Sequence, residues 1–214
     1  ALYVAYQSRK QTLVPETFFD PKHLKSYLDF NFPVDEFEEI HFDKLPQIGA
    51  YNAYSIPSAV TNELSLRFTN QIKYSHHTSP FLWKAFKEAE NGYNVSVLVH
   101  RTFFDVALVT DGKLVFANSF PYRDDNDFIY YLLYAIKQLN LKQNSVNVSI
   151  SGNIGIDSNK ITLLKRYLRN IKTTDGNPEW FAGKMFDKVE IHRFMNLLSI
   201  RECALSEVST EVEK

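Results

Sequence analysis

The sequence contains little cysteine, almost no net charge and no long hydrophobic run. Its 214 residues include a single cysteine, Cys203, so an intrachain disulfide and a four-cysteine zinc site are both excluded. The formal net charge of −1 gives no overall electrostatic attraction to nucleic acid or to an anionic membrane. The longest apolar run, around Phe128–Ile136, is interrupted by three tyrosines and is shorter than the ~20 residues that span a bilayer. We therefore expect a cytoplasmic protein that neither spans a membrane nor binds nucleic acid.

Glycine and proline are also scarce, and their scarcity argues against a disordered or collagen-like chain. The sequence has 7 glycines and 8 prolines, whereas hydrophobic residues make up 44% and charged residues 23%. These proportions are typical of a globular protein with a packed core. A length of 214 residues corresponds to one large domain or two small lobes, because domains usually have about 100–200 residues.

The clearest secondary-structure signals lie in the second half of the chain. Hydrophobic and polar residues alternate strictly in Asn94–His100, which predicts a strand with its three valines on one face. Asp111-Gly112 is a strong signal for a tight hairpin turn. The predicted order is three strands, a helix, a strand and a helix, over Asn94–His100, Phe103–Thr110, Lys113–Phe120, Asp127–Leu139, Val146–Ser151 and Ile161–Arg169.

The first half gives weaker signals of the same mixed kind. Short strands are predicted at Leu2–Ser8, Thr12–Val14, Glu39–Phe42, Ala50–Ile56 and Ile72–His76. Helices are predicted from Asp20 to about Leu28, at Ser58–Phe68 and at Phe81–Glu90. Changes in charge and pattern divide the chain into residues 1–90, residues 91–172 and a C-terminal extension, residues 173–214.

This order of elements resembles one lobe of the actin-like ATPase superfamily, in which a ribonuclease H-like fold is duplicated around a nucleotide cleft. Over its whole length the chain is similar to a family of uncharacterised bacterial proteins with a degenerate actin-like fold. The matching stretches are TLVPETFFD at Thr12–Asp20, AYSIP at Ala53–Pro57 and FFDVALVTDGKLVFANSF at Phe103–Phe120. The resemblance implies a two-lobed α/β protein with mixed sheets flanked by helices. We expect residues 1–90 to form an incomplete first lobe, because no glycine for a phosphate loop occurs before Gly49.

The resemblance also implies where a nucleotide would bind. Active members of the superfamily carry an Asp-x-Gly turn after the first strand of this lobe, whose glycine admits phosphate and whose aspartate helps to position Mg²⁺. The corresponding turn here, His100-Arg101-Thr102-Phe103, has neither residue. The loop Gly152-Asn153-Ile154-Gly155 stands where the family places glycines against adenosine, although we favour the simpler interpretation that it only turns a strand into a helix. A degenerate site for ATP with Mg²⁺ would comprise His100, Arg101, Thr102, Gly152, Asn153 and Gly155.

The residues themselves do not suggest a catalytic or metal-binding constellation. A ribonuclease H-type nuclease needs carboxylates on its first strand to hold two metal ions, and Asn94–His100 contains none. His76 and His77 are adjacent on a predicted strand, so their side chains point to opposite faces and do not bind one ion together. Cys203 lies in no local nucleophile motif. We therefore expect no catalytic residue, no metal and no cofactor.

Aromatic residues are plentiful, with 12 tyrosines and 17 phenylalanines. Tyr122, Tyr130, Tyr131 and Tyr134 crowd one predicted helix and the segment before it, and one helix face cannot bury them all. Because aromatic residues are enriched at protein interfaces, we expect these four tyrosines to form a partner surface with at least one of them exposed.

These patterns favour a non-catalytic actin-like module, a pseudoenzyme that binds an unknown protein partner or takes part in an assembly. A homo-oligomer is compatible with the sequence. The alternative is a divergent ATP-binding kinase or ATPase of the same superfamily, with the Gly152–Gly155 loop holding the base and ATP with Mg²⁺ as its cofactor.

Overall fold

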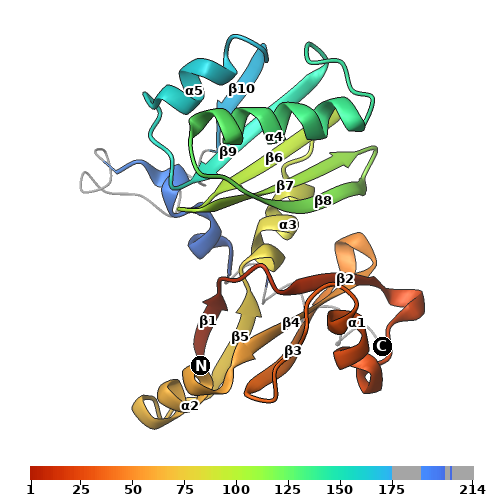
Figure 1. Cartoon of the computed structure of the whole chain (residues 1–214), viewed down its shortest axis with the longest axis vertical. Helices are drawn as coiled ribbons and strands as arrows, with labels where there is room; N and C mark the ends of the chain where they lie inside the picture. Colours follow the sequence, from red (N-terminus) through yellow and green to blue (C-terminus); the bar gives the residue numbers. More distant parts are fainter. Residues whose placement is uncertain (175–188, 201–202, 204–214) are drawn as a thin grey trace. The chain divides into compact units, whose positions relative to one another are not determined.

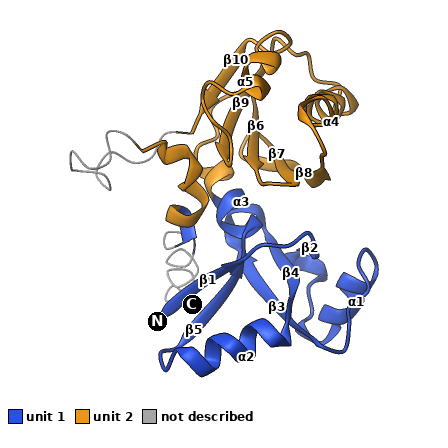
Figure 2. Ribbon diagram, turned by 60° about the vertical axis from the view of Figure 1, so that its left-hand side comes forward, with its two compact units in different colours: residues 1–83, 199–214 blue, residues 84–198 orange. Residues whose placement is uncertain are grey.

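The computed structural model describes residues 1–174, 189–200 and 203, which form two compact units (Figure 1, Figure 2). Unit 1 contains Ala1–Trp83 and the described residues from Ser199 onward, and unit 2 contains the described residues of Lys84–Leu198. Most of the expected C-terminal extension, residues 173–214, lies outside the described residues. Within the described part of the chain, no helix combines the length and the apolar character that a membrane span requires.

Unit 2 is built on a five-stranded mixed sheet with the strand order β10-β9-β6-β7-β8. β6 (Tyr93–Val99), β7 (Phe103–Thr110) and β8 (Lys113–Pro121) pair antiparallel, which confirms the three-stranded meander predicted from the sequence. β9 (Val146–Gly152) pairs in parallel with the other side of β6, and β10 (Asn170–Thr173) pairs in parallel with β9. β6 is therefore the central strand, with an antiparallel neighbour on one side and a parallel neighbour on the other.

The turn between β7 and β8 has the backbone that its sequence predicts. Asp111 and Gly112 have φ angles of 50° and 67°. A two-residue hairpin loop with positive φ at both positions matches the natural twist of the strands on either side. The turn pairs Thr110 with Lys113 and so fixes the register at this end of the hairpin.

Helices α4 (Asp125–Gln138) and α5 (Asn159–Leu164) pack against this sheet and complete the core of unit 2 (Figure 1). Their buried side chains, which include Phe128 and Leu164, join the inward valines and isoleucines of β6 and β9 in one continuous cluster. The Asp124 side chain accepts hydrogen bonds from backbone N–H groups in the first turn of α4. It therefore caps the helix, as its position before the apolar stretch predicts.

Helix α5 is shorter than the sequence predicts. α5 ends at Leu164 rather than Arg169, and the Leu168 backbone N–H turns back to the Leu164 carbonyl at 2.9 Å. Burial of the Leu168 side chain fixes this turn, and the chain then adds β10, which was not predicted. β10 is only four residues long and three of them are polar, so it carries too little hydrophobic alternation to signal a strand. Farther along the chain, unit 2 also contains a short 3₁₀ helix, Ile191–Arg193.

Unit 1 contains two small sheets. β1 (Leu2–Tyr6) pairs in parallel with β5 (Ile72–His76). β4 (Ala50–Pro57) lies between β2 (Gln11–Pro15) and β3 (Glu38–Leu45) and pairs antiparallel with both. The remaining elements are α1 (Leu24–Asp29), α2 (Ser58–Arg67), the first six residues of α3 (Thr78–Lys87), which continues into unit 2 from Lys84, and the 3₁₀ turns Glu16–Phe18, Pro21–His23 and Pro46–Ile48. β4 supplies much of the core, because five consecutive residues from Asn52 to Ile56 are buried.

The helix predicted from Asp20 begins later than expected. Asp20 does cap the chain by accepting from the Lys22 backbone N–H, but a 3₁₀ turn follows and α1 starts at Leu24. The mixed α/β class predicted from the sequence is confirmed in both units.

Candidate functional site

The turn between β6 and β7 is closed by its own backbone. The His100 N–H donates to the Phe103 carbonyl at 2.9 Å, and the rings of these two residues stack with their centroids 4.3 Å apart. Arg101 and Thr102 form the exposed tip. The backbone N–H group of His100 is therefore already hydrogen-bonded within the turn. No glycine is present in this turn, which corresponds to the Asp-x-Gly turn of active members of the actin-like ATPase superfamily.

A buried carboxylate on β7 connects this turn to the sheet. Asp105 Oδ2 lies 2.7 Å from His100 Nε2, and the Ser119 hydroxyl on β8 donates to Asp105 Oδ1. The Asp105 side chain is 2% exposed. Both of its oxygens have partners in unit 2, so this carboxylate holds the turn and the two strands together.

Tyr122, the residue directly after β8, holds the same turn in place. Its hydroxyl donates to the His100 carbonyl at 2.6 Å, and its backbone N–H donates to the Thr102 carbonyl at 3.0 Å. The ring packs against Phe104 and Phe128, and burial raises the pKa of the phenol. The structure therefore places Tyr122 in a structural contact, whereas the sequence predicts it to belong to a partner surface.

Gly152 ends β9 where the strand passes very close to β6. Its φ angle is 92°, and an added Cβ would lie 2.3 Å from the carbonyl oxygen of Val99, its pairing partner on β6. Only glycine fits such a contact without a backbone shift. The next residue continues the contact, because the Asn153 N–H donates to the same Val99 oxygen at 2.7 Å.

The rest of this loop is covered by the segment around the 3₁₀ helix Ile191–Arg193. His192 Nε2 lies 2.7 Å from the Ile154 carbonyl oxygen, and the Ile156 N–H donates to Glu190 at 3.1 Å. A Cβ on Gly155 would lie 3.3 Å from an Arg193 guanidinium nitrogen. Side chains of unit 2 itself therefore pack along the loop that the family resemblance assigns to adenosine.

The six residues predicted for a degenerate nucleotide cleft do lie together at one end of the unit 2 sheet. They belong to the turn after β6 and to the last residue of β9 and the loop after it, and these two strands are adjacent and parallel. Arg101, Thr102 and Asn153 are exposed there, whereas His100 and Gly152 are buried. Of these three exposed residues, Arg101 is the cationic one.

Two exposed aromatic residues of unit 2 lie close together on α4. Tyr130 and Tyr134 are one helical turn apart and stack with centroids 5.8 Å apart and an interplanar angle of 15°. They are 61% and 45% exposed, which confirms that at least one of the α4 tyrosines reaches solvent. Tyr131 is half-buried and stacks on Phe120 of β8. The structure thus brings together Tyr130 and Tyr134 as an exposed pair.

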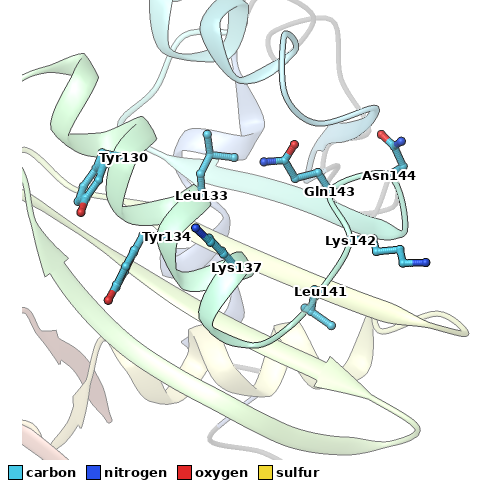
Figure 3. A pocket seen from close by; sticks show the side chains of 8 residues that line it. All are labelled: Tyr130, Leu133, Tyr134, Lys137, Leu141, Lys142, Gln143 and Asn144. Carbon is cyan, nitrogen blue, oxygen red and sulfur yellow. The ribbon is translucent and has the colours of Figure 1, made fainter.

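This tyrosine pair borders a pocket of about 790 Å³ at the C-terminal end of α4 (Figure 3). In the figure the two rings lie side by side along the helix, with their hydroxyls pointing the same way. Their six fellow lining residues are Leu133, Lys137, Leu141, Lys142, Gln143 and Asn144. Sequence reasoning found the tyrosines and missed the other six, most of which come from the segment after the helix.

A left-handed residue gives the pocket its shape. Asn140 has a φ angle of 56°, its N–H donates to the Lys137 carbonyl, and the Leu141 N–H reaches back to the Ile136 carbonyl at 3.1 Å. This pair of hydrogen bonds is the Schellman ending of a helix. It reverses the chain, so that residues 141–144 run alongside the last turns of α4. The Asn-Leu pair directly after a helical pattern was the available sequence signal.

Unit 1 contains a second polar cluster, which sequence reasoning missed entirely. The carboxylate of Asp43 on β3 is 5% exposed and accepts four hydrogen bonds. The donors are the Tyr54 hydroxyl at 3.1 Å, the Ser75 hydroxyl at 2.9 Å, the His76 N–H at 2.8 Å and the Ser79 hydroxyl at 2.5 Å. Burial raises the pKa of Asp43 to about 6, although all four donors act in the opposite direction. The cluster ties β3, β4, β5 and α3 together.

The model of one protein family matches residues 1–171. The chain belongs to DUF3822, a family of proteins of unknown function. This outcome confirms the predicted membership of an uncharacterised family. No curated protein matches this DUF3822 chain.

Solved structures show the fold of the DUF3822 chain. It is similar to a Bacteroides thetaiotaomicron protein with actin-like ATPase fold and unknown function, with a TM-score of 0.72 at 20% identity over 80% of this chain and 67% of that one. It is also similar to the PilM-PilN type IV pilus biogenesis complex, with a TM-score of 0.61 at 12% identity over 93% of this chain and 78% of that one. The DUF3822 chain therefore has the actin-like ATPase fold that its sequence predicts.

Proposed function

We propose that this DUF3822 chain is a non-catalytic actin-like module that binds a protein partner through the exposed tyrosines of α4. The observation that carries this proposal is the stacked pair Tyr130 and Tyr134, which borders a pocket and leaves about half of each side chain in solvent. Tyrosine is enriched at the centres of protein interfaces because it combines a large apolar ring with a polar end. A stacked pair is also partly fixed before binding, so that less conformational entropy is lost when a partner docks.

The similarity to a pilus biogenesis complex supports a role in assembly. That solved structure is described as a complex of PilM with PilN, so an actin-like fold of this kind occurs there together with a protein partner. At 12% identity the similarity concerns the fold alone, and the tyrosine pair is the feature of this chain that suggests where a partner docks.

The turn at His100–Phe103 supports the non-catalytic part of the proposal. Nucleotide phosphates are strongly hydrated anions, and binding them requires closely placed backbone donors and carboxylates that hold Mg²⁺. In this turn the His100 N–H is already bonded to Phe103, and the neighbouring Asp105 carboxylate is bonded to His100 and Ser119. The turn itself contains neither a glycine nor a carboxylate.

A divergent ATP-binding kinase or ATPase is the second candidate. One observation favours it: the segments after β6 and β9 meet at one end of the sheet, with the Arg101 guanidinium exposed there. Steady-state phosphate release from Mg·ATP that falls when Arg101→Ala is introduced would support this candidate. A single arginine without carboxylates to hold Mg²⁺, however, does not align a γ-phosphate for transfer. We therefore prefer the non-catalytic binding module.

Paired affinity baits test the proposed function. Tyr134 and Tyr167 have similar exposures of 45% and 49%, but only Tyr134 lines the pocket. The full chain, Tyr134→Ala and Tyr167→Ala are immobilised and incubated with a lysate of the source organism, and the retained proteins are quantified by mass spectrometry. We expect a protein that the full chain and Tyr167→Ala retain equally and that Tyr134→Ala loses. Equal retention by all three baits would contradict a partner surface on α4.

A further inference from the structure

We infer that the pocket at the end of α4 takes an acidic segment of the protein partner, one that carries a large apolar side chain flanked by Asp or Glu. This inference rests on the proposed function and adds the chemistry of the partner. The pocket offers two kinds of surface, an apolar one and a cationic one, and each selects a different part of such a segment.

The apolar part of the pocket is formed by rings and leucines. Tyr130 and Tyr134 present their stacked rings, and Leu133 and Leu141 are half-buried residues of its lining. A leucine, phenylalanine or similar side chain placed between them would be removed from water against apolar atoms. Burial of a side chain of that size contributes favourably to binding, against the costs of association. The segment is therefore expected to contain at least one such anchor.

The charged residues that line the pocket are all positive. Its lining includes Lys137 and Lys142, and none of the eight described lining residues is acidic. Neither lysine forms an ion pair with another described residue. Lys160 and Lys172, elsewhere in unit 2, do pair, with Asp125 and Glu90. Two unpaired lysines beside an apolar surface favour a partner that brings carboxylates.

Charge density distinguishes a peptide from a nucleic acid. Nucleic-acid sites neutralise many phosphates with a run of basic residues, whereas this pocket supplies two lysines. The pocket also lies at the C-terminal end of α4, where the partial negative charge of the helix carbonyls opposes a dense row of phosphates more strongly than one or two carboxylates. Side-chain amides from Gln143 and Asn144 complete the rim and suit the backbone of a peptide. A few carboxylates around an apolar anchor match this surface better than a row of phosphates.

A peptide selection tests the inference directly. The full chain is used as the target for a displayed library of random twelve-residue peptides. We expect the enriched peptides to have net negative charge and one large apolar residue. The best peptide is then synthesised with a fluorophore, and its affinity is measured by anisotropy at physiological salt.

Matched charge reversals show whether the lysines cause the selection. Lys137→Glu/Lys142→Glu should weaken binding of the peptide at least tenfold. Lys165→Glu/Arg166→Glu changes the net charge by the same amount at exposed positions outside the pocket and should leave binding within about twofold. Equal weakening by both pairs would mean that net charge alone is sensed, and would overturn the inference. Circular dichroism melts confirm that each variant is folded.

The remaining outcomes separate this inference from the proposed function. Neutral or basic peptides whose binding is lost in Tyr130→Ala/Tyr134→Ala would overturn the acidic partner while leaving the tyrosine surface intact. Another outcome is that a labelled twenty-nucleotide oligomer binds more tightly than the peptide and loses affinity with Lys137→Glu/Lys142→Glu. That result would show that the pocket binds nucleic acid, and it would overturn the inference. A selection with no peptide dependent on the tyrosines or the lysines would contradict both.

Discussion

Gly152 and Val99 are packed so closely that a single Cβ would not fit between them. The added atom would lie 2.3 Å from the Val99 carbonyl oxygen and 2.9 Å from its nitrogen, both of which are backbone atoms of the central strand. The glycine that resembles part of an adenosine loop therefore has a structural role that needs no ligand. It allows β9 to pair with β6 up to its last residue.

Gly152→Ala is expected to destabilise the chain strongly. Its cost combines a strained backbone with a forced contact, each worth about 1–3 kcal/mol. Gly92→Ala is the matched control, because Gly92 has a φ of 94° but nothing within 4 Å of the added Cβ. Gly92→Ala should lose only the backbone part. Urea unfolding measures both, and similar losses for the two variants would contradict the close contact.

Tyr122→Phe should lower stability while Tyr130→Phe should not. The Tyr122 hydroxyl donates to the His100 carbonyl at 2.6 Å, and removing it costs about 1 kcal/mol and leaves that carbonyl short of a partner. The Tyr130 hydroxyl makes no hydrogen bond to a described residue, and the side chain is 61% exposed. Thermal melts of both variants check this. A loss of stability with Tyr130→Phe, or no loss with Tyr122→Phe, would contradict the structural role of the Tyr122 hydroxyl.

Stability should fall as pH rises from about 4 to 6 because of Asp43. Burial raises its pKa from 3.8 to about 6, so in this window the folded chain holds a proton that the unfolded chain has released. The ionised form then costs about 3 kcal/mol of stability above the window, at 1.36 kcal/mol per pKa unit. Burial lowers the pKa of His41, which contributes the opposite slope below its usual value of 6.5.

The variant Asp43→Asn separates these two contributions. It removes the titrating carboxyl, so the decrease between pH 4 and 6 should disappear and the His41 slope should remain. Urea unfolding of both proteins across this range gives the difference in slope, whatever the absolute stability of the variant. A carbon-13 NMR titration reads the Asp43 carboxyl itself. A midpoint near 4, or an unchanged slope in Asp43→Asn, would refute the effect of burial.

The ending of α4 should tolerate glycine but not a β-branched residue at position 140. Asn140 holds a φ of 56°, which glycine adopts freely and valine does not. Asn140→Gly should therefore be neutral or slightly stabilising, and Asn140→Val should cost about 1–2 kcal/mol. The same pair should show peptide affinity kept in Asn140→Gly and reduced in Asn140→Val, since the turn positions residues 141–144. A neutral Asn140→Val would mean that the pocket does not depend on this turn.

The sequence predicts the fold well where local signals agree. The β6–β8 meander follows from the alternating valines of β6 and from Asp111-Gly112, and both signals are contained in neighbouring residues. β10 was missed because four residues carry little periodicity, and its position depends on pairing with β9 far away in the chain. Single glycines are equally ambiguous, since only the structure shows that Gly152 faces a backbone.

The candidate site could be predicted only in part. The tyrosines of α4 are visible in the sequence because a helix cannot bury aromatic residues around its whole circumference. Their separation into an exposed pair and a bracing Tyr122 requires the positions of Phe104 and His100. The Asp43 cluster was invisible because its donors come from positions 11 to 36 residues away. Tertiary contacts of this kind leave no local pattern.

Isothermal titration of the full chain with Mg·ATP tests the central claim of a non-catalytic module most directly. We expect no binding heat at nucleotide concentrations up to about 1 mM, because the turn at His100–Phe103 lacks both a phosphate-binding glycine and a metal-holding carboxylate. Arg101→Ala and Asn153→Ala serve as probes of the cleft, since both side chains are exposed and neither carries the Gly152 contact. A micromolar dissociation constant that either substitution weakens tenfold would contradict the claim and establish the ATP-binding alternative.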